Sequence, residues 1–263
     1  MTKYFCLLLA VVALSGCKKD KEEELVVESP GEPSVLNFQS QEYSAKTKLP
    51  CKGTCTYVSI SVPEAAGGDP VVADSINKKI FNTVRKIVYF GEKPTNAANY
   101  DEIMSSFIKS YEDLATKYPE EAIPWEAKIK ATQEYASDSL INIKVNNYMF
   151  TGGAHGYEGN LSLLFDAKTG RTLTKADLFS DVEGFTAYAE KEFRKHMKIP
   201  AGKSINSKGL MFENDKFKLP ENIFFNKEGI VLLYNPYEVG SFADGPEELT
   251  LSFEEVKQYL KMK

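Results

Sequence analysis

Two neighbouring segments of alternating polar and apolar residues constrain the fold of this chain most strongly. They cover residues 125–135 and 140–150. Successive side chains of a strand point to opposite faces, so this alternation predicts two strands that each bury one face. A third strand is predicted over residues 159–167, followed by the turn at 166–170. The short connections predict antiparallel pairing.

Apolar residues at helical spacing predict helices over residues 72–90, 100–118 and 185–197. Asn99 or Asp101 is suited to cap the second helix, and Pro119 lies just beyond its end. Methionine and aromatic residues recur in the apolar stripes of the first two helices. We interpret these stripes as core rather than as cofactor contacts.

Shorter strands are predicted at both ends of this region. The first two cover residues 38–49 and 57–62, and a hairpin over residues 223–234 turns at 226–229. A last strand at 249–252 leads into a final helix, where Ser252 and Glu255 have the spacing of a capping box. The helices cluster rather than alternate strictly with strands, which predicts an α+β fold with an antiparallel sheet packed by helices.

The N-terminus has the pattern of a lipoprotein signal. Lys3 precedes an apolar run at 5–14, and Leu14-Ser15-Gly16-Cys17 resembles a bacterial lipobox. The run is much shorter than the roughly 20 residues of a membrane span. We expect residues 1–16 to be a signal peptide and Cys17 to carry lipid, anchoring the chain at the outer membrane or cell surface. The alternative is a plain secretory signal that contains a cysteine.

Residues 17–36 are charged and then rich in Pro, Gly and Ser, without periodicity, and are interpreted as a flexible tether. The run Lys-Asp-Lys-Glu-Glu-Glu after Cys17 resembles the acidic surface-export signals of Bacteroidota lipoproteins. It is equally compatible with a generic solvated spacer. The sequence leaves the periplasmic or surface-facing orientation open.

Cys51 and Cys55 are the two cysteines beyond the predicted signal and lipidation site. In an oxidising compartment, a local pair of this kind most simply forms a disulfide that closes a small loop. No second Cys/His pair completes a tetrahedral zinc site, and a redox motif more usually has two residues between its cysteines. We therefore expect a structural disulfide and no metal.

The formal net charge is −5, and it becomes −6 when Lys3 leaves with the predicted signal peptide. Nucleic acid is thus not an expected partner, because phosphate binding needs a basic face. The composition, 43% hydrophobic and 12% aromatic, supports a substantial core.

No catalytic signature is present: there is no G-x-S-x-G elbow, no H-E-x-x-H and no phosphate-binding loop. We predict no catalytic residues and no cofactor. A hydrolase that uses converging carboxylates stays an alternative, because such pairs meet in space without a sequence signature. The acidic segment 237–248 lacks the alternating ligands of a calcium loop, and Asp244-Gly245-Pro246 is interpreted as a turn.

The segment YMFTGGAHGY, residues 148–157, contains one of only two histidines, among three glycines. Glycine permits positive φ, so a special turn between strands is the structural interpretation, with His155 locking the loop through hydrogen bonds. The functional interpretation is a ligand-binding surface in which aromatic rings stack on a sugar or grip another protein. Its candidate residues are Tyr148, Phe150, Gly152, Gly153, His155 and Tyr157.

This segment, together with the block LFDAKTGRTLTKADLF at 164–179, resembles the extracellular region of RsiV-type anti-sigma factors. It also resembles the non-catalytic N-terminal region of PdaC-type deacetylases. The stretch 237–247 and the helix after Ser252 look like the close of the RsiV-type domain. The resemblance implies an α+β extracytoplasmic module with a PdaC-like unit at 37–160 and an RsiV-like unit at 161–263.

The departures from these families limit what can be carried over. Over residues 1–263 we expect neither the sigma-binding segment and transmembrane helix of RsiV-type regulators nor a metal-dependent deacetylase domain. We expect a lipid-anchored envelope protein, not an enzyme, that binds a lysozyme-like protein or cell-wall glycan. The rival is an envelope glycan or ester hydrolase that uses carboxylates or His155, and a purely structural lipoprotein is a third possibility.

Overall fold

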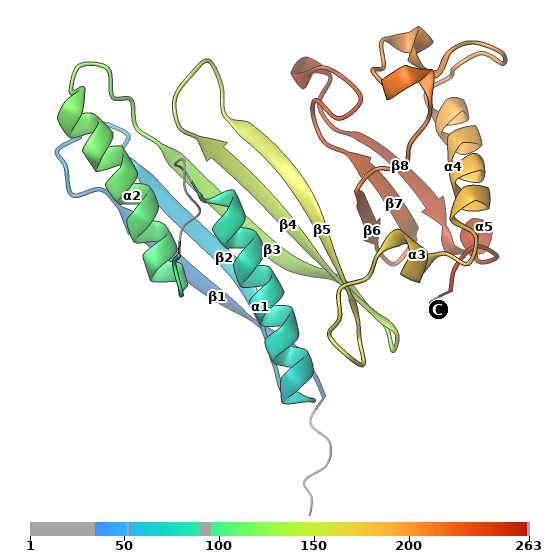
Figure 1. The fold of residues 1–263 in the computed structure, drawn as a ribbon, viewed down its shortest axis with the longest axis horizontal. Helices are drawn as coiled ribbons and strands as arrows, with labels where there is room; N and C mark the ends of the chain where they lie inside the picture. Colours follow the sequence, from blue (N-terminus) through green and yellow to red (C-terminus); the bar gives the residue numbers. More distant parts are fainter. Residues whose placement is uncertain (1–34, 52, 90–95, 262–263) are drawn as a thin grey trace, which may run out of the picture. The chain divides into compact units, whose positions relative to one another are not determined.

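A sheet in the order β1-β2-β3-β4-β5 contains the strands of the N-terminal half of the described chain (Figure 1). The computed structural model describes residues 35–51, 53–89 and 96–261, which belong to one compact unit starting after residue 33. The predicted signal peptide, Cys17 and nearly all of the tether lie outside these residues. The strands are β1 (Asn37–Lys46), β2 (Tyr57–Ala66), β3 (Glu126–Ala136), β4 (Leu140–Phe150) and β5 (Tyr157–Asp166).

One pair in this sheet departs from the antiparallel arrangement predicted from the sequence. β2 and β3 are parallel, with Ile60 opposite Ile129, whereas the other three pairs are antiparallel. The chain between them forms two helices, α1 (Pro70–Ile87) and α2 (Tyr100–Lys117). A parallel pair needs such a crossover, because the chain must return to the same end of the sheet. The prediction rested on the short turns and did not apply to this long connection.

Both helices cover the same face of the sheet (Figure 1). Asp69 caps α1, accepting a hydrogen bond from the N–H of Val71, with Pro70 in the first turn. Asn99, one of the two predicted caps, accepts from the N–H of Glu102 at the start of α2. These caps satisfy backbone donors that the helices themselves leave unpaired.

The first core lies between these helices and the sheet. Alternate residues of the central strands face the helices, and Ile60, Ala127, Ile143 and Val145 are fully buried there. Trp125 lies beneath α2, with ring centroids 5.7 Å from Phe107 and 5.8 Å from Tyr111. Each fully buried aliphatic or aromatic side chain contributes roughly 1.5–3 kcal/mol to folding. The helical stripes interpreted as core from the sequence are buried in this layer.

A second, smaller sheet has the order β6-β7-β8, all antiparallel. Phe185 and Phe193 of α4 are fully buried in its core. The capping box of Ser252 and Glu255 is present, but the final helix is only four residues long. The elements are α3 (Lys175–Leu178), α4 (Val182–His196), β6 (Asn222–Phe225), β7 (Gly229–Tyr234), β8 (Glu247–Ser252) and α5 (Phe253–Val256). The predicted α+β class is confirmed.

Side chains join the edge strands β5 and β6 where the two sheets meet. The carboxamide oxygen of Asn142 accepts from the N–H of Phe225 at 2.8 Å, and the Ser162 hydroxyl donates to the carbonyl of Ile223 at 2.6 Å. In return, Asn222 accepts from the N–H of Ser162 at 3.1 Å. Polar backbone groups at both edges are thereby satisfied without a continuous ladder.

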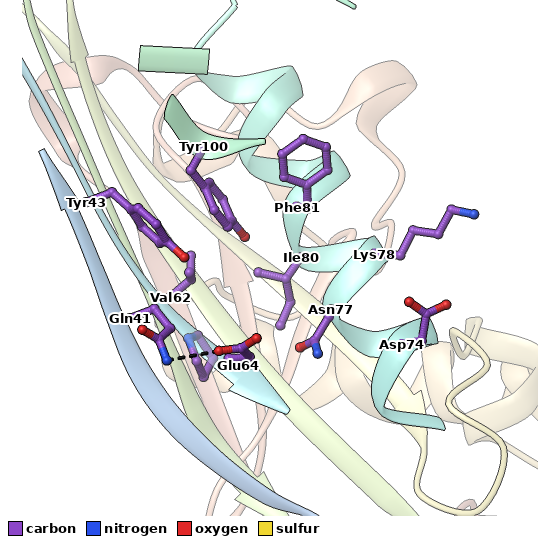
Figure 2. A pocket seen from close by; sticks show the side chains of 11 residues that line it. Gln41, Tyr43, Val62, Glu64, Asp74, Asn77, Lys78, Ile80, Phe81 and Tyr100 are labelled. Atoms are coloured by element: carbon purple, nitrogen blue, oxygen red, sulfur yellow. Dashed lines mark hydrogen bonds between the residues drawn. The ribbon is translucent and has the colours of Figure 1, made fainter. Parts of the chain in front are cut away.

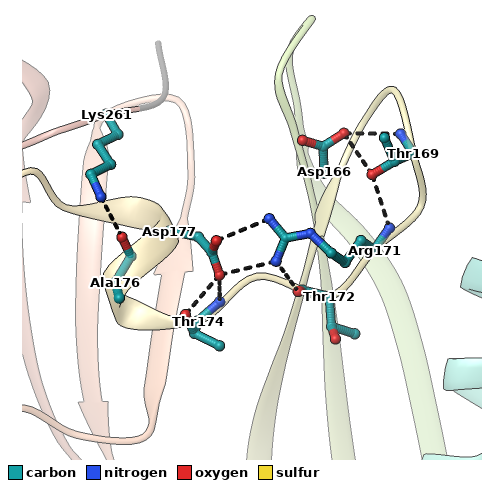
Figure 3. Close-up of polar contacts among 8 residues, drawn as sticks. All are labelled: Asp166, Thr169, Arg171, Thr172, Thr174, Ala176, Asp177 and Lys261. Carbon is teal, nitrogen blue, oxygen red and sulfur yellow. Dashed lines mark hydrogen bonds and ion pairs between the residues drawn. The ribbon is translucent and has the colours of Figure 1, made fainter.

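The second block of the resemblance, 164–179, forms the connection from β5 to α3 (Figure 3). One carboxylate oxygen of Asp166 accepts from the N–H groups of Lys168 and Thr169 and from the Thr169 hydroxyl, at 2.9–3.0 Å. Gly170 closes this turn with φ +67°, and a side chain there would meet the carbonyl oxygen of Val72 in α1. The block is thus a structural connector. Leu161, where the boundary between two units was expected, lies inside β5, and that division stays a prediction.

Candidate functional site

We call the segment YMFTGGAHGY, residues 148–157, the signature segment. It spans the end of β4, a loop at 151–156 (the signature loop) and the start of β5. Gly152 and Gly153 have φ of +108° and +93°, which few other residues adopt. Gly156 is needed for space, because a Cβ there would lie 2.5 Å from the ring of Tyr148. The loop is therefore a conformationally demanding turn.

The structure divides the predicted binding residues between the two faces of the sheet. Tyr148 pairs with Glu158, whereas Met149 pairs with Tyr157. Residues opposite each other share a face, so Tyr148 and Phe150 lie on one face and Tyr157 on the other. Tyr157 therefore does not share a face with Tyr148 and Phe150, because it pairs with Met149 and not with Tyr148.

Tyr148 is instead part of a small cluster on the solvent face. The ammonium of Lys128 lies 5.8 Å from the Tyr148 ring centroid and 5.5 Å from that of Tyr57. Lys128 also pairs with Glu126, which accepts a hydrogen bond from the Tyr57 hydroxyl. These groups satisfy one another across β2, β3 and β4.

His155 forms a different contact, which the sequence interpretation missed. Its ring stacks on Phe242 with centroids 4.0 Å apart and planes at 16°, and Tyr237 follows at 5.7 Å from Phe242. We call Tyr237, Phe242 and His155 the aromatic row. Tyr237 is 60% exposed, and its φ of +72° is strained for a residue with a side chain. One indication of this contact is present in the sequence: segments 148–157 and 237–247 both carry the family resemblance.

Beside the aromatic row, the segment after β7 is held in place by buried amides. Asn235 accepts from the N–H of Asn160 at 2.7 Å and donates to its carbonyl at 2.9 Å, so it pairs with the backbone of β5. Its amide also donates to Glu238 at 3.0 Å. The backbone around Tyr237 is therefore tied directly to the strand that follows the signature loop.

A hollow of about 300 Å³ lies next to these groups. Asn147, Met149, Tyr157 and Asn160 line it. Burial, and then the Glu238 carboxylate, raise the pKa of Tyr157, which places Glu238 within electrostatic range of that phenol. Of the predicted ligand-binding residues, Tyr157 is the one that lines this hollow; it is 42% exposed.

The contacts of His155 are a ring stack on Phe242 and one polar contact with the backbone, which are not those of a catalytic base. Its Nδ1 lies 2.9 Å from the carbonyl oxygen of Gly156, and within the described residues no carboxylate bonds to the ring. A histidine that acts as general base normally has a nucleophile or a carboxylate within hydrogen-bond reach. The geometry gives no specific support to the hydrolase alternative.

Over residues 35–51, 53–89 and 96–261, no three His, Cys, Asp or Glu side chains are grouped to hold a metal ion. None of the helices in this described part combines the length and apolar character of a membrane span. Cys51 and Cys55 form the predicted disulfide, with Cα atoms 5.5 Å apart.

Family models match two parts of the chain. Residues 50–158 match the family described as Deacetylase PdaC, and residues 176–254 match the family described as Protein of unknown function (DUF3298). The chain thus contains a region similar to PdaC, followed by a region similar to DUF3298. The resemblance drawn from the signature segment is thereby confirmed, and the aromatic row joins the two regions, since His155 lies in the first and Phe242 in the second.

Two solved structures share this fold. A DUF3298 family member from Bacteroides fragilis NCTC 9343 is 22% identical, with a TM-score of 0.70, over 87% of this chain and 94% of that one. A DUF3298 family protein from Pseudomonas aeruginosa PAO1 is 19% identical, with a TM-score of 0.59, over 88% and 95%. At this identity the likeness establishes the fold alone. Among curated proteins, none matches the chain.

The PdaC and DUF3298 regions fit a cell-envelope protein. The PdaC region corresponds to a non-catalytic part of those deacetylases, and DUF3298 has no characterised activity.

Proposed function

We propose that this protein is a lipid-anchored cell-envelope binding protein that recognises cell-wall glycan through the aromatic row. The observation that carries the proposal is the row itself: Tyr237, Phe242 and His155 follow one another at 5.7 and 4.0 Å. The outer ring face at either end of the row, on Tyr237 or His155, can bury the C–H surface of a sugar, and amides and carboxylates orient its hydroxyls. Asn147 and Asn160 line the neighbouring hollow, and the Glu238 carboxylate lies within electrostatic range of Tyr157 there.

The row is also preorganised. Asn235 fixes the segment of Tyr237 onto β5, and Ser241 and Asp244 form a capping box on either side of Phe242. Little conformational entropy is then lost on binding, which favours affinity. The backbone of Tyr237 is strained and its own ring is exposed, and backbone strain of this kind is common at binding sites.

A lysozyme-like protein is the second candidate ligand. Glu238 and Asp244 are exposed next to the aromatic row, and the whole chain has a net charge of −5. Carboxylates around an aromatic centre favour a basic protein partner. In this case the aromatic row serves as the hot spot and the carboxylates as the rim.

Calorimetric titration of the full chain in detergent with muropeptides and with lysozyme tests both candidates. We expect Phe242→Ala to weaken binding of the true ligand at least about fivefold, because a stacked aromatic contributes more than about 1 kcal/mol. Tyr118→Ala, at an exposed ring at the end of α2, is the matched control. If neither ligand binds, or if Phe242→Ala binds as the wild type does, the proposal is wrong.

Tyr237→Gly separates binding from folding. Glycine adopts the φ of +72° without strain, so stability should change by less than about 1 kcal/mol while the exposed ring is lost. We expect weaker ligand binding at an unchanged midpoint of thermal unfolding. Equal losses of binding and stability would assign a structural role to Tyr237.

Lipid anchoring at Cys17 is tested separately. Radiolabelled palmitate should enter the wild type and the Cys6→Ser control but not Cys17→Ser, because only Cys17 follows the lipobox residues. Protease treatment of intact cells then separates surface-facing from periplasmic protein. Equal labelling of all three would contradict lipidation at Cys17.

A further inference from the structure

A second hollow lies between β1, β2 and α1 and beside the start of α2 (Figure 2). Its volume is about 450 Å³, and its apolar floor includes Val62 and Ile80. It is separate from the aromatic row and has no part in the function proposed above. Its volume is within the range of small-ligand sites.

Two tyrosines form one wall. The rings of Tyr43 and Tyr100 lie 4.6 Å apart with planes at 31°, and Phe81 packs edge-on to Tyr100 at 5.3 Å. Figure 2 shows both phenol oxygens pointing into the same space. Within the described residues, neither hydroxyl makes a hydrogen bond to another group. The wall therefore presents two phenol oxygens that are free to bind.

The space in front of the phenols is electronegative. Glu64 accepts from Gln41 through Oε2 at 2.9 Å, and the structure gives its other oxygen no bond. Burial is the largest cause that raises the pKa of both Tyr43 and Tyr100, and the Glu64 carboxylate adds to it in each. Asp74 also lines the hollow, but it lies next to Lys78 and away from the phenols (Figure 2).

The remaining polar groups do not offset this charge at the phenols. The Asn77 amide is committed to the backbone of Ala65, with bonds of 2.8 and 2.9 Å to its N–H and carbonyl. Lys78 extends away from the phenols (Figure 2). A cation is thus the ligand that this arrangement favours, and an anion would be repelled.

We propose that this hollow binds a primary alkylammonium group. Such a group carries three N–H donors and no acceptor. The hollow offers three acceptors, namely the free oxygen of Glu64 and the phenol oxygens of Tyr43 and Tyr100. The floor of Val62 and Ile80 suits the methylene chain that bears the charge, as lysine stems lie along apolar surface. The same chemistry is found in a free amine and in the lysine side chain of a polypeptide.

Calorimetry and saturation-transfer NMR of the full chain test the proposal with four probes. These are n-butylamine, Nα-acetyl-lysine amide, its neutral counterpart Nα-acetyl-norleucine amide, and N-acetylglucosamine. We expect the two amines to bind and the two neutral compounds not to bind. Binding of the lysine amide alone would identify a polypeptide as the source of the ammonium group, and equal binding of both amines would indicate recognition of the group itself.

Two variants locate the binding site. Glu64→Gln should weaken amine binding about ten- to a hundredfold, because a charged hydrogen bond becomes neutral. Tyr100→Phe should weaken it several-fold while retaining the ring contacts with Tyr43 and Phe81. Glu134→Gln on β3 is the matched control and should bind as the wild type does. Absence of amine binding, equal binding of norleucine amide, preferred binding of N-acetylglucosamine or an unaffected Glu64→Gln variant would each overturn the proposal.

Discussion

Arg171 holds Asp177 through two parallel hydrogen bonds, from Nη1 to Oδ2 at 3.2 Å and from Nη2 to Oδ1 at 2.9 Å. Asp177 also accepts from the N–H and the hydroxyl of Thr174, which starts α3. One carboxylate thus connects the strand-to-helix link to the first turn of the helix. These hydrogen bonds of Asp177 explain why Arg171, Thr174 and Asp177 occur together in the second block, residues 164–179.

Asp177→Asn is expected to destabilise the protein at neutral pH and to destabilise it less in acid. The Arg171 guanidinium, and then Thr174, hold the pKa of Asp177 well below its ordinary value. A lowered folded-state pKa adds stability above the unfolded value of about 4, and this is lost as the pH falls towards the folded pKa. Urea denaturation at pH 7 and pH 3 measures the difference, with exposed Asp138→Asn as control. If the difference in unfolding free energy between Asp177→Asn and the wild type were as large at pH 3 as at pH 7, the prediction would be wrong.

Gly170→Ala should lower stability by about 2–3 kcal/mol. Its φ of +67° disfavours a side chain, and a Cβ would lie 2.7 Å from the carbonyl oxygen of Val72. Gly209→Ala is the control, because Gly209 has a similar φ of +88° with nothing within 4 Å. It should cost only the backbone strain of about 1 kcal/mol. Chemical denaturation measures both, and equal losses would remove the steric explanation.

Asn142→Ala should destabilise the protein by about 3 kcal/mol. Asn142 is fully buried and bonds to the N–H of Phe225, the hydroxyl of Ser162 and the carbonyl of Leu163. Its removal leaves buried polar groups unpaired. Asn146→Ala, four residues further along β4 with bonds to Glu158 and Asn160, should cost less than about 1 kcal/mol. Denaturation followed by hydrogen exchange at Phe225 checks that the loss arises where the sheets meet.

Replacing Cys51 and Cys55 with alanine should cost about 2 kcal/mol. The disulfide closes a loop with a sequence separation of only 4, so it restricts the unfolded chain modestly. Urea denaturation of the double variant and the wild type, both without reductant, provides the measurement. Thiol labelling of the unfolded wild type shows whether the bond is present, and a loss above about 4 kcal/mol would indicate a further structural role.

Local patterns predicted the elements well. The helix predicted over 100–118 is α2 (Tyr100–Lys117), and the strand predicted over 140–150 is β4 (Leu140–Phe150). Caps such as Asn99 and Ser252 act on their own helix within three residues, so they are visible in the sequence. The disulfide was predictable for the same reason, because its cysteines are neighbours in the chain.

Relations between distant segments were decided by the tertiary structure. The parallel pairing of β2 with β3 depends on how α1 and α2 cross the sheet, which no local pattern records. The β4–β5 register placed Tyr157 on the face opposite Tyr148. The sequence by itself determined the elements, their caps and the glycine turn at 151–156, because these follow from neighbours along the chain. Only the packing of the two sheets brought Phe242 onto His155, because such a contact depends on where whole strands dock.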